Sequence, residues 1–265
     1  MAYRRYDNKY QKGQTTPFKV SRSKIELFTQ CPRCFWLDAK LKIKRPSSPP
    51  FQINKAIDEL LKREFDGYRR DRQPHPWMVE HKIDAIPFEH KDLNKWRENF
   101  VGIQHLHEPT NLLIFGAVDD VWVTPAGELI IVDYKATSKK TEVNLDADWQ
   151  NSYKRQMEIY QWLFRQNGFK VSNMGYFVYA NGISDGDGFF NKVEFKTKII
   201  THKGSDKWVE KTIEQIKTCL EDDEMPKVGL AIMGGDCEHC VYAKQRTSLT
   251  LDYLKKNAQA KKNKL

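Results

Sequence analysis

The pattern of hydrophobic and polar positions predicts two helices early in the chain. Residues 21–41 carry apolar side chains at helix-like offsets, and Ser23 is a plausible N-terminal cap. The proline-rich stretch 45–50 is expected to end this helix. Residues 52–70 repeat their apolar positions at the spacing of one helical face, which predicts a second helix with Asp58 near its start.

The remaining pattern predicts a sheet with helices packed on it. Residues 78–86 alternate as a strand does, and residues 91–106 resemble an amphipathic helix. Beyond the central strands, the predicted elements are a helix, two strands and a helix over residues 149–166, 175–180, 193–200 and 206–221. Helices, then strands, then a helix and more strands is the order of an α/β or α+β fold.

The central segment predicts a β-hairpin. Residues 112–123 and 128–136 are rich in strand-forming side chains, and a three-residue turn containing glycine separates them. Closing this turn at Thr124 fixes the register of the two strands. In that register Asp119 lies directly opposite Asp133.

Two carboxylates that face each other destabilise a sheet unless something neutralises them. A hard divalent cation such as magnesium takes carboxylate oxygens, and the main-chain oxygen of Tyr134 is a candidate third ligand. Lys135 lies two residues beyond Asp133, so both side chains share one face of the strand. Phosphodiester hydrolysis needs such a metal and such a cation, because the metal activates water and the ammonium stabilises developing charge. The alternative from spacing alone is a surface carboxylate pair neutralised by Lys135.

The motifs GAVDD and IIVDYKA resemble the PD-(D/E)XK nuclease superfamily, and specifically its RecB-like branch. In that branch a Gly-x-x-Asp element precedes Asp-Tyr-Lys, matched here by Gly116 to Asp119 and by Asp133 to Lys135. A following helix carries Gln-x-x-x-Tyr, matched by Gln156 and Tyr160, which share a helical face. The branch also opens with a serine-containing helix that runs into Cys-Pro-Arg, matched by Ser23 and CPRC.

The resemblance extends over about residues 23–246 and implies a restriction-endonuclease-like fold, with a mixed central sheet flanked by helices. It implies Mg²⁺ or Mn²⁺ as the catalytic ion and places Gln156 and Tyr160 in the active site. The branch usually has Gly-x-x-x-His at the start of its second helix, where this chain has Asn54 to Asp58. Asp58 therefore either ligates the cation in place of histidine or marks weakened or lost activity.

Four of the five cysteines form two Cys-x-x-Cys pairs, Cys31 with Cys34 and Cys237 with Cys240. In a cytosolic chain this spacing predicts a four-thiolate metal site that clamps the N-terminal segment to the C-terminal segment. Four thiolates suit zinc as well as an iron–sulfur cluster. The RecB-like branch often holds a 4Fe-4S cluster, so the resemblance favours the cluster, although Arg246 stands where its last cysteine is usual.

The charge of the chain indicates a polyanionic partner. The net charge is +9 over 265 residues, but part of the excess lies in two segments predicted to be flexible basic tails, residues 1–20 and 251–265. The nuclease-like domain is then expected to cover residues 21–250. Hydrophobic residues make up 40% of the chain, enough for a core. The sequence shows neither an apolar stretch of about 20 residues nor a signal-peptide centre, so a cytoplasmic protein is expected.

Together these features predict a metal-dependent DNA nuclease that acts on single strands or duplex ends. The resemblance to CRISPR-associated and helicase-linked exonucleases implies a helicase or CRISPR-type protein partner. Trp36, Tyr153 and Trp162 are candidates for stacking on bases, although core packing is the expected use of most of them. Two other hypotheses remain at this point: a non-catalytic nucleic-acid-binding module with the same fold and metal clamp, and a zinc-stabilised interaction protein whose carboxylates have no catalytic role.

Overall fold

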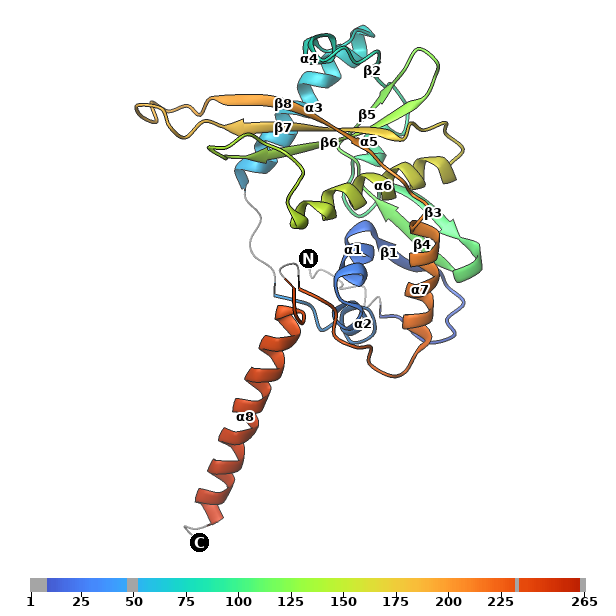
Figure 1. Cartoon of the computed structure of the whole chain (residues 1–265). Coiled ribbons are helices and arrows are strands. Elements are labelled where there is room, and N and C mark those ends of the chain that lie inside the picture. Colours follow the sequence, from blue (N-terminus) through green and yellow to red (C-terminus); the bar gives the residue numbers. More distant parts are fainter. Residues whose placement is uncertain (1–8, 47–51, 232–233, 263–265) are drawn as a thin grey trace, which may run out of the picture. The chain divides into compact units, whose positions relative to one another are not determined.

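The computed structural model describes residues 9–46, 52–231 and 234–262 (Figure 1). The chain divides into two compact units. The first comprises Met1–Gln14, Leu27–Ser47 and Gln215–Leu265, and the second comprises Thr15–Glu26 and Ser48–Glu214. The predicted nuclease residues all fall in the second unit and the paired cysteines all fall in the first. In the part of the chain that the structure describes, no helix is long and apolar enough to cross a membrane.

The second unit contains a five-stranded sheet of order β2-β5-β6-β7-β8 and a three-stranded sheet of order β1-β4-β3. The strands are β1 (Phe18–Ser21), β2 (Ile86–Pro87), β3 (Ile103–His107), β4 (Leu112–Gly116), β5 (Asp120–Val123), β6 (Leu129–Thr137), β7 (Met174–Gly182) and β8 (Phe195–Lys203). Strands β6 and β7 are parallel and the other neighbours of the larger sheet are antiparallel, so this sheet is mixed.

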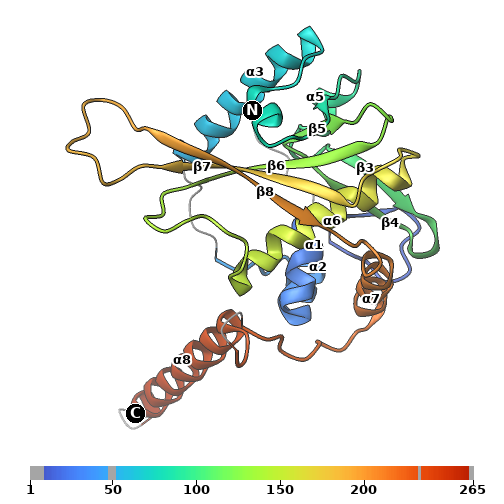
Figure 2. The same cartoon turned by 45° about the horizontal axis from the view of Figure 1, so that its top comes forward.

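Helices cover both faces of the larger sheet (Figures 1 and 2). The helices of this unit are α3 (Gln52–Asp71), α4 (Pro76–Glu80), α5 (Leu93–Trp96) and α6 (Asn151–Gln166). Leu61 and Phe65 of α3 join a buried cluster with alternate residues of β6, among them Val132. On the opposite face, Met157 of α6 packs so closely on β7 that a Cβ at Gly175 would lie 2.5 Å from its sulfur. The predicted mixed sheet flanked by helices is confirmed.

The strand predicted over residues 112–123 is wrong in one respect, because the chain leaves one sheet and enters the other. Strand β4 ends at Gly116 in the smaller sheet, and β5 begins at Asp120 in the larger one. Between them, the amide of Val118 donates to the carbonyl oxygen of Trp96 instead of to a strand. Periodicity within the segment gives no sign of this change of sheet, because both parts have strand-like composition.

The prediction for residues 71–110 is largely wrong. Helix α4 has Pro76 at its start, is capped by His75 and ends at Glu80, so it includes the first residues of the segment 78–86. Only the residues of β2 pair as a strand. The helix expected over 91–106 is limited to α5, because Phe100 and Gly102 adopt φ values of 70° and 59°. Strand β3 follows instead.

The first unit contains α2 (Pro32–Leu41) and α8 (Glu238–Lys262), while α1 (Arg22–Gln30) and α7 (Val209–Glu221) have residues in both units. The single helix predicted over 21–41 is therefore two helices. Cys31 separates them in an extended conformation, with φ −157° and ψ 102°. A residue before proline avoids the helical region, so Pro32 accounts for the break.

Parts of both predicted tails form ordered structure. Tyr10 is buried, and residues from Phe18 form β1, although both lie in the N-terminal tail as predicted. Helix α8 continues to Lys262 through most of the predicted C-terminal tail. Arg4 and Arg5 lie outside the described residues.

Candidate active site

The predicted hairpin register is confirmed along β5 and β6. Asp120 pairs with Val132, and Thr124 donates its amide to the carbonyl oxygen of Glu128 at the turn, 3.0 Å away. Asp119 stands one residue before β5. Its carboxylate accepts a hydrogen bond of 2.8 Å from the main-chain amide of Tyr134, so it lies against β6 between the two predicted catalytic positions.

Asp133 is a completely buried carboxylate on β6. Its Oδ1 accepts a hydrogen bond of 2.7 Å from Nε2 of Gln156, which also lies 3.3 Å from the hydroxyl of Tyr160. Its Oδ2 forms an ion pair with Lys135. Burial raises the pKa of Asp133, Lys135 lowers it, and the charge of Asp119 raises it further. The resulting pKa is about 6. A buried carboxylate of this kind favours a nearby cation.

Lys135 is held beside both carboxylates as an ammonium ion. Its Nζ lies 4.5 Å from the ring centroid of Tyr153, which is a cation–π distance. Burial lowers the pKa of Lys135, but the charges of Asp133 and Asp119 more than offset this effect, and the pKa is raised above its usual value. Lys135 is therefore suited to stabilising negative charge and unsuited to accepting a proton.

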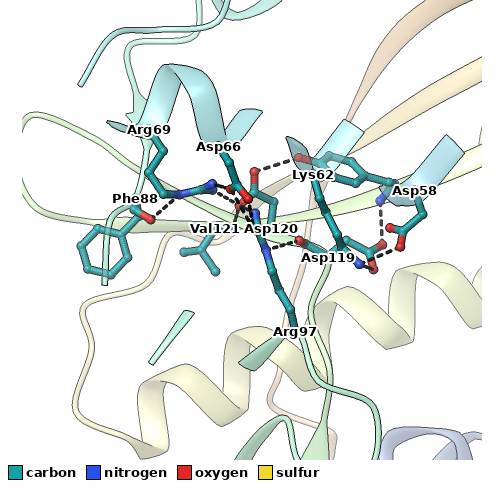
Figure 3. Close-up of polar contacts among 10 residues, drawn as sticks. Asp58, Lys62, Asp66, Arg69, Phe88, Arg97, Asp119, Asp120 and Val121 are labelled. Carbon is teal, nitrogen blue, oxygen red and sulfur yellow. Dashed lines mark hydrogen bonds and ion pairs between the residues drawn. The ribbon is translucent and has the colours of Figure 1, made fainter. Parts of the chain in front are cut away.

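Asp58, near the start of α3, is linked to Asp119 by Lys62, which contacts both carboxylates. The sequence analysis did not identify this lysine. Lys62 lies four residues after Asp58 and places its Nζ 2.7 Å from Asp58 and 3.7 Å from Asp119 (Figure 3). Burial and the charge of Asp119 raise the pKa of Asp58. The i, i+4 spacing from Asp58 was the available signal for Lys62, because such pairs face each other on a helix.

The acidic residues provide the donor set of a hard cation. Asp119 lies close enough to Asp58 and to Asp133 to raise the pKa of each, and oxygen donors suit Mg²⁺ or Mn²⁺. They do not form a compact triad. Among the described residues, the only group of three or more potential ligands whose atoms all lie within 4.8 Å of one another is the cysteine group. The ligand role of the Tyr134 main-chain oxygen stays a prediction.

Gly116 and Tyr160, which belong to different motifs, meet in space. A Cβ at Gly116 would lie 2.5 Å from Cε1 of Tyr160, so only glycine leaves room for this ring. The hydroxyl of Tyr160 also interacts with Arg22, a residue that the sequence analysis did not identify. Burial lowers the pKa of Arg22, but Tyr160 and Asp133 raise it beyond that effect. Arg22 thus adds a buried positive charge near Asp133.

A second acidic residue of the GAVDD motif points to the opposite face of the sheet. Asp120 is fully buried, and its carboxylate pairs with Arg69, with Nη2 of Arg97 at 2.8 Å and with the hydroxyl of Tyr134 at 2.8 Å (Figure 3). Arg97 also donates its Nε to the main-chain oxygen of Asp119 at 3.0 Å. This network holds the backbone that carries the Asp119 carboxylate.

We expect Asp120→Ala to destabilise the protein by about 3–5 kcal/mol, because it removes the buried carboxylate shared by Arg69 and Arg97, leaves them only the half-exposed Asp66, and takes away the hydrogen-bond acceptor of the Tyr134 hydroxyl. Asp120→Asn, which keeps hydrogen-bonding capacity, should cost less. Urea unfolding of both variants measures the difference. Loss of under about 1 kcal/mol on substitution by alanine would contradict the assignment.

The three aromatic residues named as candidates for base stacking differ in solvent accessibility. Trp162 is 2% exposed and Trp36 is 9% exposed, and Nε1 of Trp36 donates to the main-chain oxygen of Asp222. Both are core residues, as expected for most of these aromatic side chains, and neither is accessible for base stacking. Tyr153 remains beside Lys135.

The four paired cysteines of the first unit converge as predicted. Their sulfur atoms all lie within 4.8 Å of one another, with Sγ–Sγ separations of 3.8 Å for Cys31 and Cys240, 3.8 Å for Cys34 and Cys237, and 3.6 Å for Cys34 and Cys240. None forms a disulfide. The amide of Gly229 donates to the sulfur of Cys31 at 3.2 Å.

The surroundings of the cysteines favour a thiolate at Cys31, whereas burial raises the pKa of Cys34 and of Cys240. Burial raises the pKa of Cys31, but backbone hydrogen bonds from Cys34 and Gly229 and contacts with the other sulfurs lower it to about 7. Arg45 donates to the sulfur of Cys237 at 3.3 Å. The group therefore has the donor type, number and charge environment of a structural metal site.

Comparison with known families agrees with this geometry. The model of the PD-(D/E)XK nuclease superfamily matches residues 48–245, so the chain belongs to this superfamily. Its members are generally metal-dependent phosphodiester hydrolases. No curated protein matches the chain. Among solved structures, the chain is similar to one titled "Crystal structure of SSO0001", with 13% identity, a TM-score of 0.36 and coverage of 78% of this chain and 79% of that one.

Proposed function

We propose that this protein is a divalent-metal-dependent DNA nuclease of the RecB-like branch, acting on single strands or duplex ends. The main support is the proximity of three residues in a PD-(D/E)XK domain. Asp119, just before β5, contacts the backbone of β6 at Tyr134, and Asp133 pairs with Lys135 on β6. An exonuclease mode and a helicase or CRISPR-type partner are supported by the resemblance alone.

Each residue has a distinct role in this proposal. Asp119 and Asp133 hold Mg²⁺ or Mn²⁺, which when bound polarises the phosphate and lowers the pKa of the attacking water. Gln156 fixes the orientation of the Asp133 carboxylate through its hydrogen bond to Oδ1. Lys135, already protonated, stabilises the charge that develops on the phosphoryl oxygens.

The proposal is tested with labelled single- and double-stranded DNA incubated with magnesium, manganese or a chelator. Cleavage that requires either metal supports it. Tight binding without cleavage under any of these conditions overturns it in favour of a non-catalytic nucleic-acid-binding module. Failure to bind DNA even at low salt favours an interaction protein, because electrostatic binding is strongest there.

Asp58 distinguishes an active site that uses aspartate in place of histidine from one that has lost activity. We expect Asp58→Ala to lower the cleavage rate by about 10- to 100-fold, since Asp58 lies close to the metal-binding carboxylate Asp119. Asp58→His should retain more activity. Lys55→Ala, on the exposed part of the same helix, is the control. An unchanged rate for Asp58→Ala would exclude Asp58 from the site.

We further infer that the four-cysteine site holds zinc. A tetrahedral zinc site with Zn–S bonds of about 2.3 Å places its thiolates about 3.8 Å apart. The observed separations of 3.6 and 3.8 Å agree with this value. A 4Fe-4S cluster stands between its thiolates and spreads them to roughly 6 Å. This geometry supports zinc over the cluster that the resemblance favours.

A further inference from the structure

The register of the larger sheet places a second lysine in line with Lys135. Lys135 of β6 pairs with Tyr179 of β7, and Tyr179 pairs with Lys198 of β8. Paired residues project from the same face, so the three side chains form one row across the sheet. Because neighbouring strands lie about 4.8 Å apart, the Cα atoms of the two lysines are about 10 Å apart.

A cavity of about 300 Å³ opens at the far end of this row. It is bordered by residues 143–146, by β8 and by Lys154 near the start of α6, and Lys198 and Lys203 also line it. Since α6 also provides Gln156 to Asp133, the cavity and the catalytic residues adjoin the same helix, and Lys198 shares the sheet face of Lys135.

The charges around this cavity are mainly positive. Within the described ranges, neither Lys154 nor Lys203 has an ion-pair partner, whereas Lys198 pairs with the exposed Glu142 at 2.5 Å. His202 on the same strand is hydrogen-bonded to Glu158. The lining contains three lysines and one acidic residue, Asp146. This balance suits a phosphate group.

Aromatic side chains adjoin the row on the side of α6. The ring of Tyr153 lies under Lys135, and Trp149 packs edge-to-face on Tyr153 with a centroid separation of 5.4 Å. Trp149 remains 43% exposed, and Lys139 lies 5.5 Å from its centroid. An exposed ring next to a line of cations is the arrangement by which proteins bind single-stranded nucleic acid, because bases stack while phosphates are neutralised.

We propose that this cavity binds the phosphates of a single nucleic-acid strand next to the phosphate that is cleaved, with Trp149 stacking on a base. The proposal rests on the proposed nuclease function and defines the substrate of the same site as single-stranded. A base-paired strand cannot offer a free base face to Trp149, whereas an unpaired strand can follow the row from Lys135 to Lys198.

The binding test uses fluorescein-labelled oligothymidylate in chelator, with fluorescence anisotropy as the readout. The double variant Lys154→Glu, Lys203→Glu should bind at least about 10-fold more weakly than the wild type. The slope of the logarithm of its binding constant against the logarithm of salt concentration should be smaller in magnitude by about one unit or more. Lys170→Glu, at the opposite end of β6, is the matched control. Equal affinities for the double variant and this control would overturn the proposal.

Three further variants separate binding from folding and from stacking. The neutral double variant Lys154→Gln, Lys203→Gln should show a smaller loss in the same direction with an unchanged thermal unfolding curve. Trp149→Ala should weaken binding to oligothymidylate, and Trp149→Phe should restore much of it. An equal loss of duplex binding on Trp149→Ala would overturn the assignment of a single strand.

A cleavage test distinguishes failure of this proposal from failure of the nuclease proposal. With manganese, the wild type should hydrolyse bis(4-nitrophenyl) phosphate, because this small diester reaches the catalytic residues without occupying the cavity. The double variant Lys154→Glu, Lys203→Glu should raise the KM for single-stranded DNA. If the wild type hydrolyses neither substrate, the nuclease proposal fails, while the binding test in chelator still decides the cavity.

Discussion

Asp133→Ala is expected to lower metal-dependent cleavage by at least about 10³-fold while the protein remains folded. The carboxylate is fully buried and stands between Gln156 and Lys135. Its removal takes away a proposed metal ligand, and it also removes a buried charge whose desolvation is costly, so stability should change less than activity does. Initial rates with magnesium and manganese, together with urea unfolding, measure both effects.

Lys135→Ala should have a comparable effect on the cleavage rate, since the ammonium group is the cation nearest to Asp133. Lys135→Arg keeps the charge but not the compact shape, so it should recover only part of the activity. Lys140→Ala, an exposed lysine beyond the end of β6, should leave the rate unchanged. A wild-type rate for Asp133→Ala or Lys135→Ala would show that the active site lies elsewhere.

The core of this site could be predicted because it depends on local geometry. A short turn fixes the register of β5 and β6, and alternation along a strand fixes which side chains share a face. The positions of Asp133 and Lys135 follow from these two rules. The same alternation places Asp120 on the opposite face, but it does not identify the residues that pair with Asp120 there.

The remaining features depend on contacts between distant parts of the sequence. The chain changes sheets after Gly116 where the ring of Tyr160 approaches it, and Arg97 reaches the backbone of Asp119 from α5. Periodicity within a segment carries no information about such neighbours. For the same reason Arg22 was not identified from sequence, although it lies beside Tyr160.

The protein purified from cells is expected to contain one zinc ion per chain, and Cys34→Ser should remove it. In small zinc domains the metal contributes on the order of 10 kcal/mol, which is comparable with the whole stability of a typical domain. The variant should therefore expose the first unit to proteolysis. Metal analysis and limited proteolysis measure these outcomes, and Cys219→Ser, which changes the cysteine outside the group, is the control.

Substitution of the zinc by Co²⁺ tests the geometry of this site directly, because four thiolates around a tetrahedral cobalt ion give strong visible absorption. Cys34→Ser should weaken these bands, and Cys219→Ser should preserve them. Protein that is brown when purified without oxygen and contains iron with acid-labile sulfide would contradict the zinc assignment. The sulfur atoms would then have to stand farther apart than the observed 3.6 to 3.8 Å, because a cubane cannot fit between thiolates at that distance.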